Sequence, residues 1–203
     1  MRTPFVVTAT LITAALLAAP PLTATLAAQG APANACKARN ATHDERITGC
    51  TKLIEAKTET GRSLAIAYCN RGFALTEKNE LDEALADLEQ AIKIDPTDAC
   101  PFNNRGRVFT LKGDLERATA DYDQAIKLDP KLAAAYNNRG DALLKRNELD
   151  KAIEDFTTAI KLDPQNVDAY GNRGWAHLRK HDLHPALADY SKAIELEPDD
   201  LMG

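Results

Sequence analysis

The amino-acid sequence predicts an all-helical solenoid in which four helix-turn-helix units of 34 residues follow an N-terminal helix. Three observations predict this fold: a period shared by several residue types, helical spacing of apolar residues within each period, and the composition. Hydrophobic residues make up 44% of the 203-residue chain, but aromatic residues make up only 5%. A composition rich in helix-forming residues and poor in aromatic side chains favours closely packed helices over an all-β sandwich.

The period is the strongest of these observations, because independent markers return every 34 residues. The glycine of an Asn-Arg-Gly triplet lies at Gly72, Gly106, Gly140 and Gly174. A proline and an alanine keep the same step, at Pro96, Pro130, Pro164 and Pro198 and at Ala84, Ala118, Ala152 and Ala186. Tandem units of this length bury their apolar surfaces against their neighbours.

The third unit shows how each period divides into two helices. Its first helix is expected over residues 133–146 and its second over residues 149–162, with a turn at Asn147. Apolar residues in the second segment follow the i, i+3, i+4, i+7 spacing of one helix face. Pro164 ends the unit, because proline disfavours helical geometry in the residue before it. The small side chains of Gly140 and Ala152 indicate that the two helices approach closely.

This unit resembles the tetratricopeptide repeat family in its aromatic, small and proline positions. These positions are Tyr136, Gly140, Ala152, Phe156, Ala159 and Pro164. The resemblance covers four full repeats, at residues 65–98, 99–132, 133–166 and 167–200, and implies a right-handed superhelix. It also implies a non-catalytic scaffold that binds another protein or an extended peptide in the concave groove of the array.

Residues 1–28 have the pattern of a secretory signal peptide, in which Arg2 precedes an apolar run and small residues follow it. The run of about 15 residues is short for a membrane-spanning helix, which needs about 20. A cleaved signal predicts a periplasmic or secreted protein, with a retained anchor as the alternative. Residues 29–64 are expected to hold a linker and a capping helix, because residues 46–54 match the second-helix segment at 84–92.

All four cysteines lie beyond this N-terminal segment, which predicts two disulfide bonds in an exported chain. We expect Cys36 to pair with Cys50, which would staple the capping helix. We expect Cys69 to pair with Cys100 on the neighbouring first helix, with free buried thiols or a different pairing as alternatives. A zinc site is disfavoured because the chain has no CxxC spacing.

Two charged series follow the same period and predict one ion pair per repeat. An arginine precedes each repeated glycine, and an aspartate follows that arginine sixteen residues later. The expected pairs are Arg71–Asp87, Arg105–Asp121, Arg139–Asp155 and Arg173–Asp189. Each pair would link the two helices of a unit or two neighbouring units. The alternative, a basic binding stripe, is disfavoured because the aspartates would cancel its charge.

The first helices of the units are expected to line the concave face, where two sets of residues are candidates for binding. The first set is an asparagine at one repeat position, at Asn70, Asn104, Asn138 and Asn172. The family resemblance implies that this amide holds peptide main chain; the alternative is a bond to a neighbouring helix. The second set differs from repeat to repeat, as expected for specificity, and comprises Phe73, Arg107, Asp141 and Trp175. Trp175 is the candidate anchor, because aromatic side chains dominate interface energetics.

The C-terminal end suggests an alternative function. Few residues follow the fourth repeat, so its second helix is expected to expose part of its apolar face at Leu187, Tyr190 and Ile194. Such a face predicts a structural self-assembly unit and a possible homodimer through the C-terminal end.

Other function classes find no support in the sequence. The net charge of −5 disfavours binding of nucleic acid. Motifs such as GxSxG and HExxH are missing, so we expect no enzyme activity, cofactor or small-molecule substrate. His177, His181 and His184 lie close in sequence, but His181 falls in the expected turn, so no metal site is expected. Some members of the family bind the C-terminal carboxylate of a chaperone through a clamp that needs lysine at the second place of a repeat. This chain has Ile66, Cys100, Ala134 and Asp168 there, so this kind of recognition is not expected.

Overall fold

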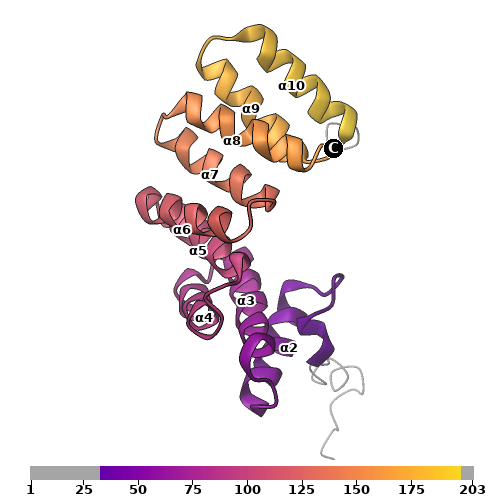
Figure 1. Ribbon diagram of the computed structural model, residues 1–203. Helices are drawn as coiled ribbons and strands as arrows, with labels where there is room; N and C mark the ends of the chain where they lie inside the picture. Colours follow the sequence, from indigo (N-terminus) through magenta and orange to yellow (C-terminus); the bar gives the residue numbers. More distant parts are fainter. Residues whose placement is uncertain (1–32, 198–203) are drawn as a thin grey trace, which may run out of the picture. The chain divides into compact units, whose positions relative to one another are not determined.

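The computed structural model describes residues 33–197, in which every regular element is a helix and successive helix pairs follow one another along the array (Figure 1). The predicted all-helical fold of consecutive helix-turn-helix units with an N-terminal helix is confirmed. The predicted signal peptide at residues 1–28 lies outside the described residues. The elements are η1 (Ala33–Cys36), α2 (His43–Ala56), α3 (Gly61–Glu77), α4 (Leu81–Ile94), α5 (Ala99–Leu111), α6 (Leu115–Leu128), α7 (Ala133–Lys145), α8 (Leu149–Leu162), α9 (Val167–Arg179) and α10 (Leu183–Leu196).

Each repeat is a pair of helices joined by a short turn, and each second helix also packs on the first helix of the next repeat. One residue of the turn has a positive φ in every repeat, at Asn79 (62°), Gly113 (79°), Asn147 (64°) and His181 (65°). Glycine adopts this left-handed conformation at no steric cost, whereas asparagine and histidine adopt it at some cost in free energy. The period in the sequence therefore extends to the backbone conformation of the turns.

The two helices of a repeat approach closely where the repeated glycine meets a large side chain. A Cβ atom added at Gly140 would lie 2.7 Å from Cε1 of Phe156, and one added at Gly106 would lie 2.7 Å from Cε1 of Tyr122. Phe156 and Tyr122 are almost fully buried. This packing confirms that the glycine is small because the ring occupies the space beside it.

Helix α2 is a second helix that has no complete first helix before it. Lys78 pairs with Asp44 of α2 in the way that Lys112 pairs with Asp82 of α4. The equivalent residues Asp44 and Asp82 are 38 positions apart in the sequence, four more than the repeat period of 34. The four additional residues form an extra turn at the start of α3, which begins at Gly61 where the sequence predicts a start near Ala65. The predicted capping helix is thus present and follows the geometry of the repeats.

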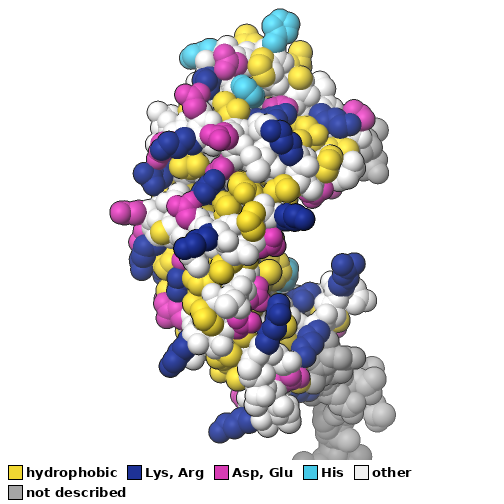
Figure 2. All heavy atoms as spheres, in the orientation of Figure 1, with side chains coloured by type: hydrophobic (Ala, Val, Ile, Leu, Met, Phe, Trp, Pro, Cys, Tyr) yellow, Lys and Arg dark blue, Asp and Glu magenta, His cyan; other side chains and the backbone are white. Residues whose placement is uncertain are grey.

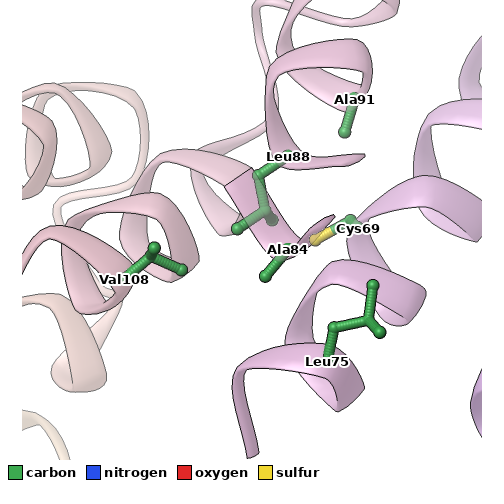
Figure 3. Close-up of a cluster of buried hydrophobic side chains, with 6 residues drawn as sticks. All are labelled: Cys69, Leu75, Ala84, Leu88, Ala91 and Val108. Carbon is green, nitrogen blue, oxygen red and sulfur yellow. The ribbon is translucent and has the colours of Figure 1, made fainter. Parts of the chain in front are cut away.

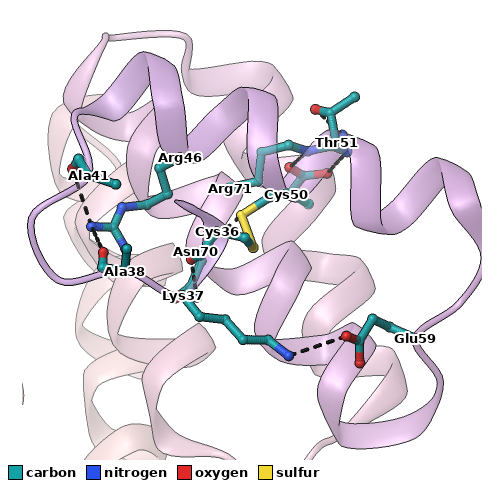
Figure 4. The surroundings of a disulfide bond; sticks show 11 residues. Cys36, Lys37, Ala38, Ala41, Arg46, Cys50, Thr51, Glu59, Asn70 and Arg71 are labelled. Atoms are coloured by element: carbon teal, nitrogen blue, oxygen red, sulfur yellow. Dashed lines mark hydrogen bonds and ion pairs between the residues drawn. A yellow bond between two sulfur atoms is a disulfide. The ribbon is translucent and has the colours of Figure 1, made fainter. Parts of the chain in front are cut away.

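The predicted Cys36–Cys50 disulfide holds the short helix η1 against α2 (Figure 4). Both cysteines are fully buried and pack with Ala67 of α3. The carbonyl oxygen of Cys36 accepts a hydrogen bond from Nδ2 of Asn70 at 2.9 Å. The asparagines at the same position in later repeats donate to the first helix of the preceding repeat. Helix η1 therefore takes the place of the missing first helix, and the disulfide fixes it there.

The predicted Cys69–Cys100 bridge is wrong, because the structure has both residues as free thiols. Cys69 is buried in a cluster with Leu75, Ala84, Leu88, Ala91 and Val108 (Figure 3). Its Sγ also accepts a hydrogen bond from Nδ2 of Asn104, whereas Cys100 is exposed at the start of α5. Neighbouring first helices bring the two residues near each other, but the Cys69 side chain packs within the buried cluster and forms no bond to Cys100. Burial raises the pKa of the Cys69 thiol to about 12.

Candidate protein-binding surface

The first helices of successive repeats lie beside one another, since α3 contacts α5, α5 contacts α7 and α7 contacts α9. We call the surface that these four helices share the first-helix face. It carries both candidate sets from the sequence. Over the side of the molecule seen in Figure 2, basic and acidic side chains are interspersed without a large patch of one sign.

The repeated asparagines link each repeat to the one before it. Nδ2 of Asn104 donates to Sγ of Cys69 at 3.4 Å, and Nδ2 of Asn138 donates to Oδ1 of Asn103 at 3.0 Å. Nδ2 of Asn172 donates in the same way to Oδ1 of Asn137 at 3.3 Å. The structure thus shows the bond to a neighbouring helix that was the alternative to ligand contact. All four asparagines remain partly exposed, so the two roles are compatible.

The variable set divides into engaged and available side chains. Phe73 lies against the ring of His43 at a centroid distance of 6.2 Å, and the Arg107 guanidinium lies 6.0 Å from the Phe73 ring centroid. Arg107 also pairs with Glu77 of the preceding repeat. Asp141 pairs with Lys145 one turn along α7. Trp175 is 49% exposed, which makes it the most available aromatic side chain of the set.

The predicted arginine–aspartate pairs are confirmed in all four repeats, within each repeat. Arg139 donates from Nε to Oδ2 of Asp155 at 2.7 Å and from Nη2 to Oδ1 at 2.7 Å. Its third nitrogen, Nη1, reaches Asp123 of the preceding repeat at 2.6 Å. The hydrogen bonds to Asp155 are the main reason that the pKa of Arg139 is raised. The aspartates are buried, so these arginines are structural links and not a basic stripe.

Two periodic features of these links escaped the sequence reasoning. Each paired arginine lies over an aromatic ring three residues earlier, at distances of 5.7 to 5.8 Å, in Tyr68, Phe102, Tyr136 and Tyr170. A lysine after the first helix also reaches the second helix of the preceding repeat, in Lys78–Asp44, Lys112–Asp82 and Lys180–Asp150. The aromatic residues of the first set and the lysines of the second recur at multiples of 34 residues, and this period in the sequence could have revealed both sets.

Two cavities lie over the arginine–aspartate pairs and between successive second helices. One, of about 400 Å³, is lined by residues that include Asp123, Arg139 and Lys151. The other, of about 380 Å³, lies over Arg71 and Asp87 beside α2. The charged side chains that line the first cavity are largely paired with one another, as in Lys151 with Glu148. The cavities therefore mark the second helices as the alternative surface for a partner, and an experiment must distinguish it from the first-helix face.

The histidines of the last repeat are spread over two helices and the turn between them. His177 Nδ1 lies 3.6 Å from Oδ2 of Asp182, and His181 occupies the left-handed turn position. Within residues 33–197, no three His, Cys, Asp or Glu side chains come together as ligands for one metal ion. None of the described helices is both long enough and apolar enough to span a membrane.

The repeats match two family models. The model described as tetratricopeptide repeat matches residues 65–98, 133–166 and 167–200, and the model described as TPR repeat matches residues 106–146. The chain belongs to the tetratricopeptide repeat family. Proteins of this family act as scaffolds that bind peptides or other proteins, and they are generally not catalytic. No curated protein matches this TPR chain in sequence.

Solved structures share the fold of this TPR protein. MamA from Desulfovibrio magneticus (residues 41 to the end) is 20% identical, with a TM-score of 0.65 over 84% of this chain and 93% of that chain. TTC0263, a thermophilic TPR protein from Thermus thermophilus, is 21% identical, with a TM-score of 0.68 over 78% and 85%. The first TPR of Spaghetti, bound to an HSP90 peptide, is 20% identical, with a TM-score of 0.57 over 61% and 98%. At these identities the likeness establishes the fold.

Proposed function

We propose that this TPR protein is a non-catalytic scaffold that binds an extended segment of another protein along its first-helix face. The observation that carries the proposal is the contrast between repeated and variable positions on that face. The close-packing glycine and the linking asparagine, arginine and aspartate are the same in every repeat, whereas Phe73, Arg107, Asp141 and Trp175 differ at a single repeat position. A repeat array that keeps its linking residues constant and varies its exposed first-helix positions can select one partner while keeping its fold.

The asparagines support binding of main chain. Each amide has two N–H donors and an oxygen acceptor, and the bond to the preceding repeat uses one donor. That bond orients the amide before any ligand arrives, which lowers the entropy lost on binding. The remaining donor and acceptor can pair with the backbone of an extended peptide. The partly exposed amides are therefore suited to hold a peptide independently of its side chains.

The variable positions indicate the chemistry of the bound segment. Trp175 offers a half-exposed aromatic anchor, and the ion pairs that Arg107 forms with Glu77 and Asp141 forms with Lys145 place charges of both signs on the same face. A segment with an apolar anchor residue flanked by mixed charges fits this arrangement better than a strongly charged one. The Spaghetti repeat binds an HSP90 peptide, but none of the four clamp positions in this chain carries a basic residue. We therefore expect selection by aromatic contact and not by capture of a C-terminal carboxylate.

The proposed place of action is the periplasm or the exterior of the cell. The signal-like pattern of residues 1–28 supports export, and the buried Cys36–Cys50 disulfide is compatible with an oxidising compartment. Fractionation of cells, with the N-terminal sequence of the isolated protein, tests this part of the proposal. Protein found only in the cytoplasm with an intact N-terminus would contradict it.

Site-specific photocrosslinking in the native cell tests the proposed surface. A photoreactive residue is placed at Leu111, which is 51% exposed on the first-helix face, or at Leu162, which is 39% exposed at the end of α8. We expect a discrete adduct with a second protein from position 111, and its loss when Trp175→Ala is added. Position 162 is the matched control of similar exposure and should give no such adduct. Adducts from position 162 alone would place the partner on the second helices and refute the proposal.

A further inference from the structure

The last repeat exposes a stripe of large apolar side chains. We call this surface the terminal face, and it comprises Leu178 of α9 with Leu183, Leu187, Tyr190 and Ile194 of α10. Leu183 and Leu187 are 65% and 67% exposed. The corresponding positions of the third repeat are covered by α9, so that Leu144 is 5% exposed and Phe156 fully buried. The terminal face therefore has the chemistry of an inter-repeat interface without its partner helix.

The size of the terminal face suits an interface between two proteins. Its four most exposed side chains present on the order of 400 Å² of apolar surface, at the level of the largest patch on a typical monomer. A standard interface buries about 800 Å² per partner, of which about 65% is apolar in homodimers. The terminal face thus supplies most of the apolar area that such a dimer needs.

The opposite end of the array does not offer a matching surface. No large hydrophobic side chain in the described part before α3 is exposed. Helix η1, fixed by the disulfide, covers part of α2, and the first turn of α2 presents the exposed acids Asp44 and Glu45. A second copy therefore finds no apolar surface for head-to-tail stacking at this end. Of the two ends of the described array, the terminal face is therefore the one that offers an apolar surface to a second copy.

The charges along α10 fix the direction of that contact. The exposed Leu183, Leu187 and Ile194 and the partly exposed Tyr190 follow the spacing of a helix–helix seam. His184 lies near the N-terminus of the helix, and Glu195 and Glu197 lie at its C-terminal end. Antiparallel pairing aligns the two helix dipoles favourably and keeps Glu195, which pairs with Lys192 of its own helix, away from the same residue of the other copy. Parallel pairing would set glutamates against glutamates.

We propose that the terminal face pairs with the terminal face of a second copy of this chain, about a two-fold axis, with the two α10 helices antiparallel. In this arrangement position 187 of one copy meets position 190 of the other, and position 183 meets position 194. The contact includes Leu178, one turn after Trp175 on α9, and leaves the first helices of the earlier repeats outside it. The inference does not depend on the function proposed for the first-helix face.

Measurement of the solution mass of the full chain against concentration tests the pairing. We expect the mass to rise to that of a dimer and to stop there at about 100 µM. Leu187→Glu should give a monomer, while Leu162→Glu, which adds the same charge at an exposed leucine outside the terminal face, should remain a dimer. Far-UV circular dichroism confirms that both variants are folded. A wild-type monomer, growth beyond the dimer, or a dimer unaffected by Leu187→Glu would each overturn the proposal.

Disulfide trapping tests the antiparallel direction. Leu183→Cys and Ile194→Cys are prepared separately in a Cys100→Ser background, which removes the exposed native thiol. Positions 183 and 194 are about 16 Å apart along α10 at 1.5 Å per residue. We therefore expect neither variant to crosslink with itself, but a mixture of the two to form a crosslinked heterodimer. Crosslinking of each variant with itself, or no crosslinking in the mixture, would overturn the antiparallel arrangement.

Discussion

Substitution of Gly140 by alanine tests the packing on which every repeat depends. The added Cβ would lie 2.7, 2.9 and 3.0 Å from three carbons of the Phe156 ring, whereas carbon atoms in contact prefer 3.5–4.0 Å. The ring is fully buried, and protein interiors are close-packed, so it cannot turn out into solvent to relieve the contact. Overpacking of this kind costs about 1–3 kcal/mol, and the better helix propensity of alanine returns up to about 1 kcal/mol. We expect Gly140→Ala to lose about 1–2 kcal/mol of unfolding free energy.

Two other first-helix glycines provide matched controls for this substitution. A Cβ at Gly171 meets nothing within 4 Å, so Gly171→Ala should gain about 0.5–1 kcal/mol from propensity alone. A Cβ at Gly174 would lie 3.2 Å from Tyr190, a partly exposed ring that can shift. Gly174→Ala should therefore fall between the other two variants. The three substitutions are chemically identical and differ only in the space beside the glycine.

The assay is thermal and chemical denaturation of the three variants, followed by circular dichroism. In a domain of this size, a change of 1 kcal/mol shifts Tm by about 2–4 °C. The expected difference between Gly171→Ala and Gly140→Ala is about 2 kcal/mol, or about 4–8 °C. If Gly140→Ala were as stable as Gly171→Ala, the contact between glycine and ring would not limit the repeat, and the packing argument would fail.

Three further predictions follow from the buried and strained groups. Arg139→Ala leaves the buried Asp155 carboxylate unpaired and should lower the free energy of unfolding by about 3 kcal/mol. Lys151→Ala, which removes one partner of an exposed pair, should lower it by under about 1 kcal/mol, and equal losses in the two variants would refute the role of burial. His181→Gly relieves the left-handed turn and should raise stability by about 0.5–1 kcal/mol, while a lower Tm would contradict the strain. Burial raises the Cys69 pKa from 9.0 to about 12, so the free energy of unfolding should fall as pH rises above 9, and this alkaline sensitivity should be lost in Cys69→Ala. A thiol reagent at neutral pH should modify the exposed Cys100 before the buried Cys69, and the reverse order would contradict the assignment.

Much of the fold could be predicted because the sequence repeats every feature that the packing needs. The small glycine and alanine of the helix–helix contact and the arginine–aspartate pair each recur four times, so their association could be inferred without coordinates. The cap could be located for the same reason, since residues 46–54 repeat a second-helix pattern. The extra turn at the start of α3 was missed because residues 61–64 have no counterpart in the later repeats.

The remaining features depend on side-chain direction, which a repeat period does not encode. Neighbouring first helices suggested a Cys69–Cys100 bridge, but the Cys69 side chain turns into the core toward Leu88 and leaves Cys100 exposed. The asparagine series was correctly placed on the first helices, yet an amide there can face a ligand or the preceding repeat. The structure shows the bond to the preceding repeat.

The fluorescence of Trp175 tests the central claim most directly, because it is the only tryptophan in the chain. The probe is the partner segment identified by crosslinking from position 111, added as a synthetic peptide. We predict a blue shift of the emission and protection from acrylamide quenching, since a bound segment would cover a side chain that is now 49% exposed. A peptide that binds by calorimetry but leaves emission and quenching unchanged would contradict recognition through the first-helix face.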